Sequence, residues 1–140
     1  TVKGAVAEVL LNAPDRKNAL PLTAWQAIPA LLEKLKQEPA VRACIVRGAG
    51  GKSFSAGADI SEFEAVRSTP EAAARYDAVN VAAFKALKAA GYDGWYVIEA
   101  FGRSLPEVAA ATRVWRDFFP HTDEVFQSGH DFLRAEWGKA

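Results

Sequence analysis

A run of small residues followed by an acidic one is the feature of this sequence that best fits chemistry. The run is Ser55-Ala-Gly-Ala-Asp59, and the spacing of Asp59 and Glu62 predicts that a helix begins at its end. Small side chains let a substrate lie close to the backbone. Backbone N–H groups at a helix N-terminus can stabilise negative charge on a carbonyl oxygen without reorganising. The segment therefore indicates a site that could hold an oxyanion.

Two other patterns that could carry chemistry are weaker. Gly48-Ala-Gly-Gly-Lys-Ser53 is similar to a phosphate-binding loop, but Val46 stands where such a loop needs glycine. Phe54 also continues the loop where a helix should begin. His121 and His130 have no zinc-binding spacing, so we expect both to be exposed residues at helix ends.

Composition limits the classes of protein that this chain could belong to. Its 140 residues fit one modest domain. The 17 basic and 17 acidic side chains give zero net charge, which argues against nucleic-acid binding. No apolar run is long enough to span a membrane. A single cysteine fits a reducing compartment, and we expect a cytoplasmic protein with no membrane contact.

Apolar patterns predict an α/β fold with a small, largely parallel sheet and flanking helices. Strands are predicted at 6–11, 43–46 and 95–98, and helices at 22–37, from 59 onwards, 71–90, 104–118 and 123–137. Pro29 lies inside the first helix and should kink it or remove a hydrogen bond. The continuous apolar run 43–46 is typical of a buried strand, which would make Cys44 a buried structural thiol. We expect strand 95–98 to pair with it in parallel.

Three separate motifs in residues 1–85 resemble the crotonase superfamily, the enoyl-CoA hydratase/isomerase family. They are Asn12-Ala-Pro-Asp-Arg-Lys-Asn-Ala-Leu20, Val41-Arg-Ala-Cys-Ile-Val-Arg-Gly-Ala-Gly-Gly51 and Phe54-Ser-Ala-Gly-Ala-Asp-Ile60. The resemblance covers roughly the N-terminal third of a family member. It implies a truncated crotonase-like layer with a helical C-terminal tail, and an acyl-CoA thioester as the ligand.

The resemblance also implies roles for individual residues. The Ala58 N–H would be one of two oxyanion-hole donors for the thioester carbonyl. Ala56 and Ile60 would flank the pantetheine arm, and Asp59 would open the following helix. Two residues of the first motif, Lys17 and Ala19, would lie near the phosphates and adenine of CoA. No cofactor is required by this chemistry.

The catalytic centre departs from the family's pattern. The family's second oxyanion donor lies in a helix start with three consecutive glycines, and this chain has no such run. The family's acid/base carboxylates come later still, and a hydratase needs such a pair to position water and move protons. Glu99 and Glu107 are the only carboxylates in comparable places, and neither lies in a matching motif. Glu99 is the catalytic candidate, and we expect weak activity at most.

A second resemblance begins near residue 86. Residues 91–103 and 105–117 are similar to the last βα unit of xylose-isomerase-like TIM-barrel sugar phosphate isomerases/epimerases. In that family the glutamate at the end of this strand is a divalent-metal ligand and an acid/base residue, which here would be Glu99. The family's other ligands come from strands that this sequence lacks, and one carboxylate holds an octahedral ion poorly. We therefore do not expect a divalent metal unless the second resemblance determines the function.

The two resemblances divide the chain into segments 1–85 and 86–140, which we expect to pack as one domain. The second segment holds ten of the fifteen aromatic residues. Exposed aromatic patches usually meet a partner, so we expect a homo-oligomer. The aromatic residues that two terminal helices cannot all bury are Trp115, Phe118, Phe119, Phe126, Phe132 and Trp137.

Three hypotheses for function follow. The first is an acyl-CoA-binding protein of the crotonase family with low or no activity. The second is a fragment derived from a sugar phosphate isomerase/epimerase. The third is a folded chimera without catalysis. Stabilisation by acetyl-CoA would favour the first and stabilisation by Mn²⁺ the second, whereas neither ligand would stabilise the third.

Overall fold

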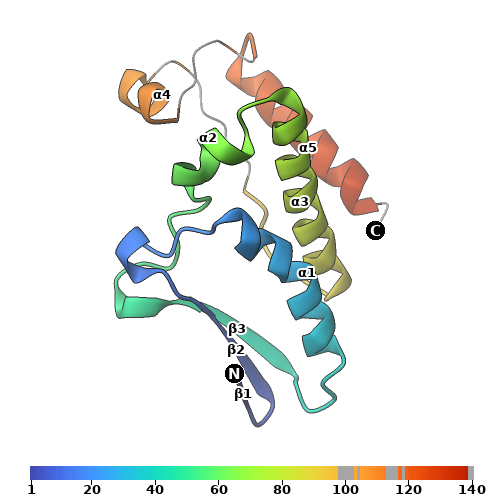
Figure 1. The fold of residues 1–140 in the computed structure, drawn as a ribbon. Coiled ribbons are helices and arrows are strands. Elements are labelled where there is room, and N and C mark those ends of the chain that lie inside the picture. Colours follow the sequence, from blue (N-terminus) through green and yellow to red (C-terminus); the bar gives the residue numbers. More distant parts are fainter. Residues whose placement is uncertain (98–102, 104, 113–116, 118, 139–140) are drawn as a thin grey trace. The chain divides into compact units, whose positions relative to one another are not determined.

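The computed structural model describes residues 1–97, 103, 105–112, 117 and 119–138. The chain divides into two compact units, Thr1–Tyr92 and Asp93–Ala140. The first unit contains strands β1 (Val2–Lys3), β2 (Val6–Leu11) and β3 (Ala43–Gly48), helices α1 (Leu22–Lys36), α2 (Phe63–Val66) and α3 (Pro70–Ala89), and short 3-10 turns at Pro14–Arg16, Ala49–Gly51 and Ile60–Glu62 (Figure 1). The second contains α4 (Pro106–Thr112) and α5 (Thr122–Gly138).

The sheet of the first unit is small and mixed, with β2 in the centre. β1 pairs with β2 in an antiparallel hairpin, and β2 pairs with β3 in parallel along all six of its residues. The β2–β3 connection runs through α1, as a parallel pair requires. The longer pairing confirms the predicted parallel βαβ arrangement, and β1 adds the antiparallel strand that the apolar pattern did not reveal.

β3 corrects the prediction of a buried strand. The strand is present at the predicted place, but Ile45 is 54% exposed, Val46 is 47% exposed, and Cys44 is an exposed free thiol. The reason is that β3 lies at the edge of the sheet in the described part of the chain, with β2 as its neighbour. A continuous apolar run predicted the strand correctly, but burial requires a second layer that the run itself does not provide.

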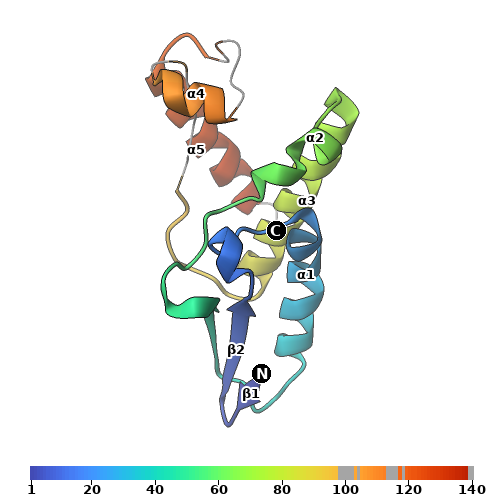
Figure 2. The same ribbon diagram turned by 60° about the vertical axis from the view of Figure 1, so that its left-hand side comes forward.

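Helices α1 and α3 lie side by side and form the apolar centre of the first unit (Figures 1 and 2). Ala83 and Tyr76 of α3 are fully or almost fully buried, and Trp25 of α1 meets Phe84 of α3 edge to face with ring centroids 6.3 Å apart. Both helices confirm the periodicity in the sequence. α1 accommodates Pro29 in its interior.

The boundaries of α3 follow from local capping. The Thr69 hydroxyl accepts a hydrogen bond from Ala72 N–H at the start, where Pro70 occupies the first helical position. At the other end Gly91 has a φ of +87°, and its N–H donates to Lys88 O. Glycine adopts this left-handed conformation without strain, so it ends the helix as the sequence predicts.

The second unit differs from the prediction at its start. Residues 95–97 are irregular rather than extended in a strand, and Trp95 and Val97 are 92% and 85% exposed. The sheet of the described residues consists of β1, β2 and β3 and does not include residues 95–97. Ile98, the last residue of the predicted strand, lies outside the described residues. The predicted strand is therefore not formed at residues 95–97, and its pairing with Ala43–Val46, which would join the two units, stays a prediction.

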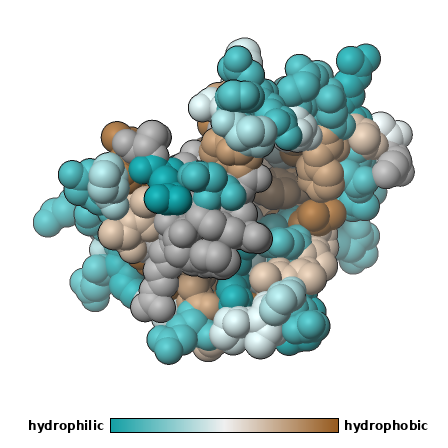
Figure 3. Space-filling model, turned by 90° about the horizontal axis from the view of Figure 1, so that it is seen from above, coloured by the Kyte–Doolittle hydropathy of each residue, from teal (hydrophilic) through white to brown (hydrophobic). Residues whose placement is uncertain are grey.

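The last helix, α5, is present as predicted, whereas α4 covers only Pro106–Thr112 of the predicted 104–118. The aromatic residues of α5 are partly exposed. Phe126 and Phe132 of α5 are 46% and 53% exposed, whereas the Trp137 ring packs 4.7 Å from the Tyr96 ring. Trp115 and Phe118 lie outside the described residues. In Figure 3, which views the protein from above, apolar residues lie among hydrophilic ones on the visible face. Self-association through these aromatics stays a prediction.

None of the helices in the described part of the chain is both long enough and apolar enough to cross a bilayer.

Candidate functional site

The loop at residues 55–59 presents one backbone N–H outward. Leu20 and Ala58 form an isolated parallel bridge, in which Leu20 N–H donates to Gly57 O at 2.8 Å and Leu20 O accepts from Asp59 N–H at 2.9 Å. Because Leu20 makes both bonds, the N–H and C=O of Ala58 face away from it. Ala58 is half-buried. Its N–H is therefore held in a fixed direction and is free of this pairing.

Asn18 connects the three motifs, although its role was not predicted. It is 1% exposed. Its Nδ2 donates to Ala49 O at 3.0 Å and to Ser53 O at 2.9 Å, and its Oδ1 accepts from Ala13 N–H at 3.0 Å. These bonds join the first motif to both ends of the Gly-rich loop. The side chain thus fixes the loop that leads into residues 55–59.

Ser55 extends this network into the candidate site itself. Its hydroxyl donates to Asn18 O at 2.8 Å and accepts from Gly57 N–H at 3.1 Å. The Gly57 φ of +86° is the left-handed conformation that lets the chain turn between Ser55 and Ala58. The Ala58 N–H is therefore positioned by two sets of bonds, one from Ser55 and one from Leu20.

Asparagine at position 18 is the sequence signal that could have pointed to this network, whereas the role of Gly48 is visible only in the structure. Lys17 and Asn18 both have positive φ, 51° and 56°, and asparagine is among the few residues that tolerate this region. At Gly48 the requirement is steric rather than conformational, since its φ is −83°. An added Cβ would lie 2.6 Å from Asn18 Nδ2 and closer still to the carbonyl oxygens of Ser53 and Phe54. Glycine is required there because the backbone at Gly48 passes very close to the backbone at Ser53 and Phe54.

Asp59 is the buried charge of the site, with 5% of its surface exposed. Its Oδ1 accepts from Ser61 Oγ at 2.6 Å and from Ser61 N–H at 3.1 Å, and its Oδ2 forms an ion pair with Arg16. The Ser61 hydroxyl, opposed by burial and assisted by Arg16, lowers the pKa of Asp59 below its usual value. Asp59 does open the following turn as predicted, through its bond to Ser61 N–H.

Glu62 performs a different task from the one its spacing suggests. Instead of bonding back to Asp59, its Oε2 accepts a hydrogen bond from Leu22 N–H at 2.8 Å. Leu22 begins α1, and Pro21 at the preceding position offers no side-chain cap. Glu62 therefore caps the N-terminus of α1 from a distant part of the chain. Its negative charge also interacts favourably with the helix dipole.

The structure brings together most of the residues predicted to bind substrate. Ala56, Ile60 and Phe54 are exposed around Ala58, and Ile60 and Phe54 expose 58% and 61% of their surfaces. Lys17 is exposed and Ala19 half-buried in the adjoining first motif. Their contacts with a ligand stay predictions.

The predicted acid/base residues do not join this site. Glu99 lies outside the described residues. Glu107 is exposed in the first turn of α4, in the second unit. Among described residues, no three of the His, Cys, Asp and Glu side chains come together as a metal site. His121 and His130 are exposed as expected, but His130 lies within α5 rather than at its end.

Lowering the pH should weaken this loop through Asp59. The folded chain lowers the Asp59 pKa, so it favours the charged carboxylate. That stability is present above the unfolded pKa of about 3.9 and is lost as pH falls through the folded pKa. Carboxyl ¹³C NMR titration should place the Asp59 pKa below the ordinary range, and Ser61→Ala should raise it. An Asp59 pKa unaffected by Ser61→Ala would contradict this cause.

Both the sequence and the structure are similar to those of known proteins. Residues 6–92 match the protein family described as enoyl-CoA hydratase/isomerase. An enoyl-CoA hydratase/carnithine racemase structure from Magnetospirillum magneticum is 40% identical with a TM-score of 0.59, and the match covers 64% of this chain and 33% of that one. The matched range contains all three motifs and ends at the boundary between the two units.

Two curated relatives differ in their reactions. The human mitochondrial 3-hydroxyisobutyryl-CoA hydrolase is 43% identical over 58 residues, which is 41% of this chain and 15% of the relative. A Synechocystis protein named "Probable ketose 3-epimerase" is 41% identical over 54 residues, 39% of this chain and 19% of the relative. This chain spans about a quarter or less of the first curated relatives that it matches.

Proposed function

The chain belongs to the enoyl-CoA hydratase/isomerase family, and we propose that it binds an acyl-CoA thioester at residues 55–60 with little or no turnover. The observation that carries the proposal is the direction of the Ala58 N–H. Leu20 forms backbone hydrogen bonds to Gly57 and Asp59, the residues on either side of Ala58. The Ala58 N–H therefore faces away from Leu20. A thioester carbonyl oxygen placed there would accept a hydrogen bond from a fixed donor.

The surroundings of Ala58 suit the rest of such a ligand. Exposed Ile60 and Phe54 offer apolar surface for the acyl group or the pantetheine arm, and Ala56 and Gly57 leave the backbone accessible. Lys17 is exposed on the adjoining loop, where an ammonium group could meet CoA phosphates. These placements support a CoA thioester over an uncharged small molecule, and they require no metal.

Low turnover follows from how the nearby carboxylates are already used. Asp59 is bound by Arg16 and Ser61, and Glu62 accepts from Leu22 N–H. Neither is available to activate water. Without a second oxyanion donor, transition-state stabilisation falls by about 3–4 kcal/mol, and without a positioned acid/base pair the rate falls by a further ~10²–10⁴-fold.

Replacing Ala58 with Pro should abolish the preference for a thioester. Acetyl-CoA and S-ethyl-CoA differ at the carbonyl oxygen, so their affinity ratio isolates the hydrogen bond to it. We expect the natural chain to bind acetyl-CoA about 3- to 10-fold more tightly, the equivalent of one net hydrogen bond. Ala58→Pro removes the N–H and should bring the ratio to about one, as measured by isothermal titration calorimetry.

The matched control is Ala58→Gly, which keeps the N–H and should keep the ratio. Circular dichroism verifies that both variants fold. Equal affinities of the natural chain for the two ligands would reject Ala58 as the donor. Hydration of crotonyl-CoA at a rate typical of enzymes would reject low turnover, and Glu99 with Glu107 would then be the residues to replace first.

A second candidate function is that of a sugar phosphate isomerase/epimerase fragment, favoured by the similarity to the Synechocystis protein. On this alternative Glu99 would ligate a divalent ion. Its test is thermal stabilisation by Mn²⁺, with Glu99→Gln as the variant that should lose the shift. Stabilisation by acetyl-CoA and not by Mn²⁺ would favour thioester binding, because a ligand stabilises only the folded state that binds it.

A further inference from the structure

A closed ring of hydrogen bonds joins the beginning of α1 to the segment that follows Ala58. Leu22 N–H donates to Glu62 Oε2 at 2.8 Å. Glu62 N–H donates to Asp59 O at 3.2 Å, and Asp59 N–H donates to Leu20 O at 2.9 Å. Leu20 and Leu22 are separated by a single residue, so these three bonds return to their starting point. Ala58, whose N–H is the proposed donor, is the residue that directly precedes the ring.

The chain that closes this ring between Leu20 and Leu22 has little freedom. Pro21 connects the two residues with a φ of −67°, the value that the proline ring imposes. Proline also has no N–H, so Pro21 cannot replace Leu22 as a donor to the Glu62 carboxylate. The ring therefore depends on the bond from Leu22 to Glu62.

Glu62 is the residue through which the sequence controls the ring. Of the three bonds, only the one from Leu22 uses a side chain. The other two join backbone groups, which every residue except proline can supply. The Glu62 carboxylate also meets an N–H that has no intrahelical acceptor, at a helix N-terminus where negative charge is favoured. The identity of residue 62 therefore decides whether the ring closes.

The backbone bridge that directs the Ala58 N–H is short and shares a bond with the ring. It is an isolated bridge between Leu20 and Ala58, and one of its two bonds is the bond from Asp59 N–H to Leu20 O. A pairing of two segments has little stability of its own, even when it is longer than this one. Opening the ring at Glu62 would therefore loosen the bridge and let the Ala58 N–H turn.

We propose that Glu62 is a positioning residue for the thioester site, which fixes the direction of the Ala58 N–H by keeping the ring closed. The inference rests on the proposed function, because it assigns Glu62 to the same donor. In this role Glu62 neither touches the ligand nor moves a proton, and its effect reaches Ala58 through Asp59 and Leu20. All of these contacts lie within the first unit.

Amide hydrogen exchange without ligand tests the positioning separately from binding. The N–H groups of Leu20 and Asp59 make the two bonds of the bridge. Both should exchange about 3- to 10-fold faster in Glu62→Ala, the equivalent of one net hydrogen bond. Glu62→Gln keeps a side-chain oxygen that can accept from Leu22 N–H, and we expect it to restore slow exchange. Unchanged exchange of both amides in Glu62→Ala would overturn the proposal.

The affinities for acetyl-CoA and S-ethyl-CoA test the consequence for the site. Isothermal titration calorimetry should give a natural chain that prefers acetyl-CoA by about 3- to 10-fold, with the preference below about 2-fold in Glu62→Ala and retained in Glu62→Gln. A preference in Glu62→Ala as large as in the natural chain would overturn the positioning role. Equal affinities of the natural chain for the two ligands would instead reject thioester binding, and the exchange rates alone would then decide whether Glu62 fixes the segment at Ala58.

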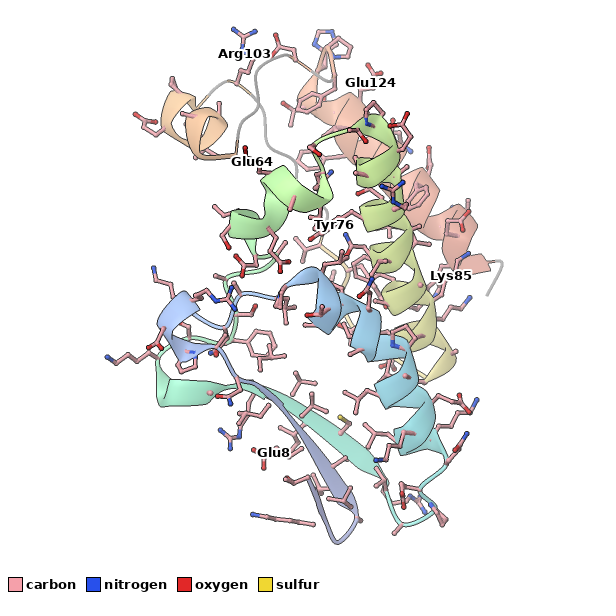
Figure 4. The ribbon with its side chains drawn as sticks, viewed as in Figure 1. Glu8, Glu64, Tyr76, Lys85, Arg103 and Glu124 are labelled. Atoms are coloured by element: carbon pink, nitrogen blue, oxygen red, sulfur yellow. The ribbon has the colours of Figure 1, made fainter. Side chains whose placement is uncertain are left out.

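Two control variants separate positioning from a general loss of stability and from a loss of charge. Thr69→Ala removes the cap of α3, the hydroxyl that accepts from Ala72 N–H, and should lower the urea midpoint as Glu62→Ala does. Glu64→Ala removes a carboxylate from an exposed residue of α2 (Figure 4). Both should leave the bridge exchange and the acetyl-CoA preference unchanged. An equal loss of that preference in Thr69→Ala would show that Glu62 acts only through stability and would overturn the proposal.

Discussion

Asn18→Asp is expected to lower the free energy of unfolding by about 3–5 kcal/mol, a large part of the stability of a domain this size. The substitution preserves size and the Oδ1 acceptor for Ala13 N–H. It replaces the Nδ2 donor with a carboxylate oxygen that would face the carbonyl oxygens of Ala49 and Ser53. Buried acceptors would then be left without a donor and would repel the new charge. Urea denaturation followed by circular dichroism measures the loss.

The matched control is Asn12→Asp, the same chemical change at an exposed position of the same motif. We expect it to alter the free energy of unfolding by no more than about 0.5 kcal/mol. The loss in Asn18→Asp should also depend on pH, because protonating the new carboxyl at low pH removes its charge and returns one donor. Similar losses at positions 12 and 18 would show that Asn18 does not join the loops.

Gly48→Ala is expected to cost at least about 3 kcal/mol, toward the upper end of overpacking substitutions. The added methyl group would meet the carbonyl oxygens of Ser53 and Phe54 and the Asn18 amide. Two of these three are backbone atoms, which cannot rotate away, so the crossing of the loops must open. We expect binding of acetyl-CoA to weaken along with stability, because the same crossing leads into Ser55 and Ala58.

Gly51→Ala separates this steric effect from the backbone effect of losing glycine. Gly51 has a φ of +67°, but nothing lies within 4 Å of an added Cβ. The left-handed conformation costs an alanine about 1–2 kcal/mol. A rule based on φ alone predicts that Gly51 is the more sensitive position, since Gly48 has an ordinary φ of −83°. Denaturation curves that make Gly51→Ala the more damaging change would contradict the close approach.

The family of the first 85 residues was recognisable from sequence because its motifs are short and their chemistry is local. The match over residues 6–92 confirms it. Composition changes near residue 86, and the first compact unit ends at Tyr92, after α3 has ended at its glycine. The predicted segments 1–85 and 86–140 and their packing as one domain stay a prediction. The second resemblance, in residues 86–140, stays a prediction, as does the role of Glu99.

The amino-acid sequence by itself determined the elements whose causes lie within a few residues. Helical periodicity and Thr69 set α3, and the apolar run set β3. Only the tertiary structure decided which of these surfaces are covered and which residues hold the site. Ile45 is exposed because no second layer covers it among the described residues, and residues 95–97 are irregular despite their apolar sequence. Asn18 bonds to Ser53, 35 positions later, and no local pattern encodes a contact at that separation.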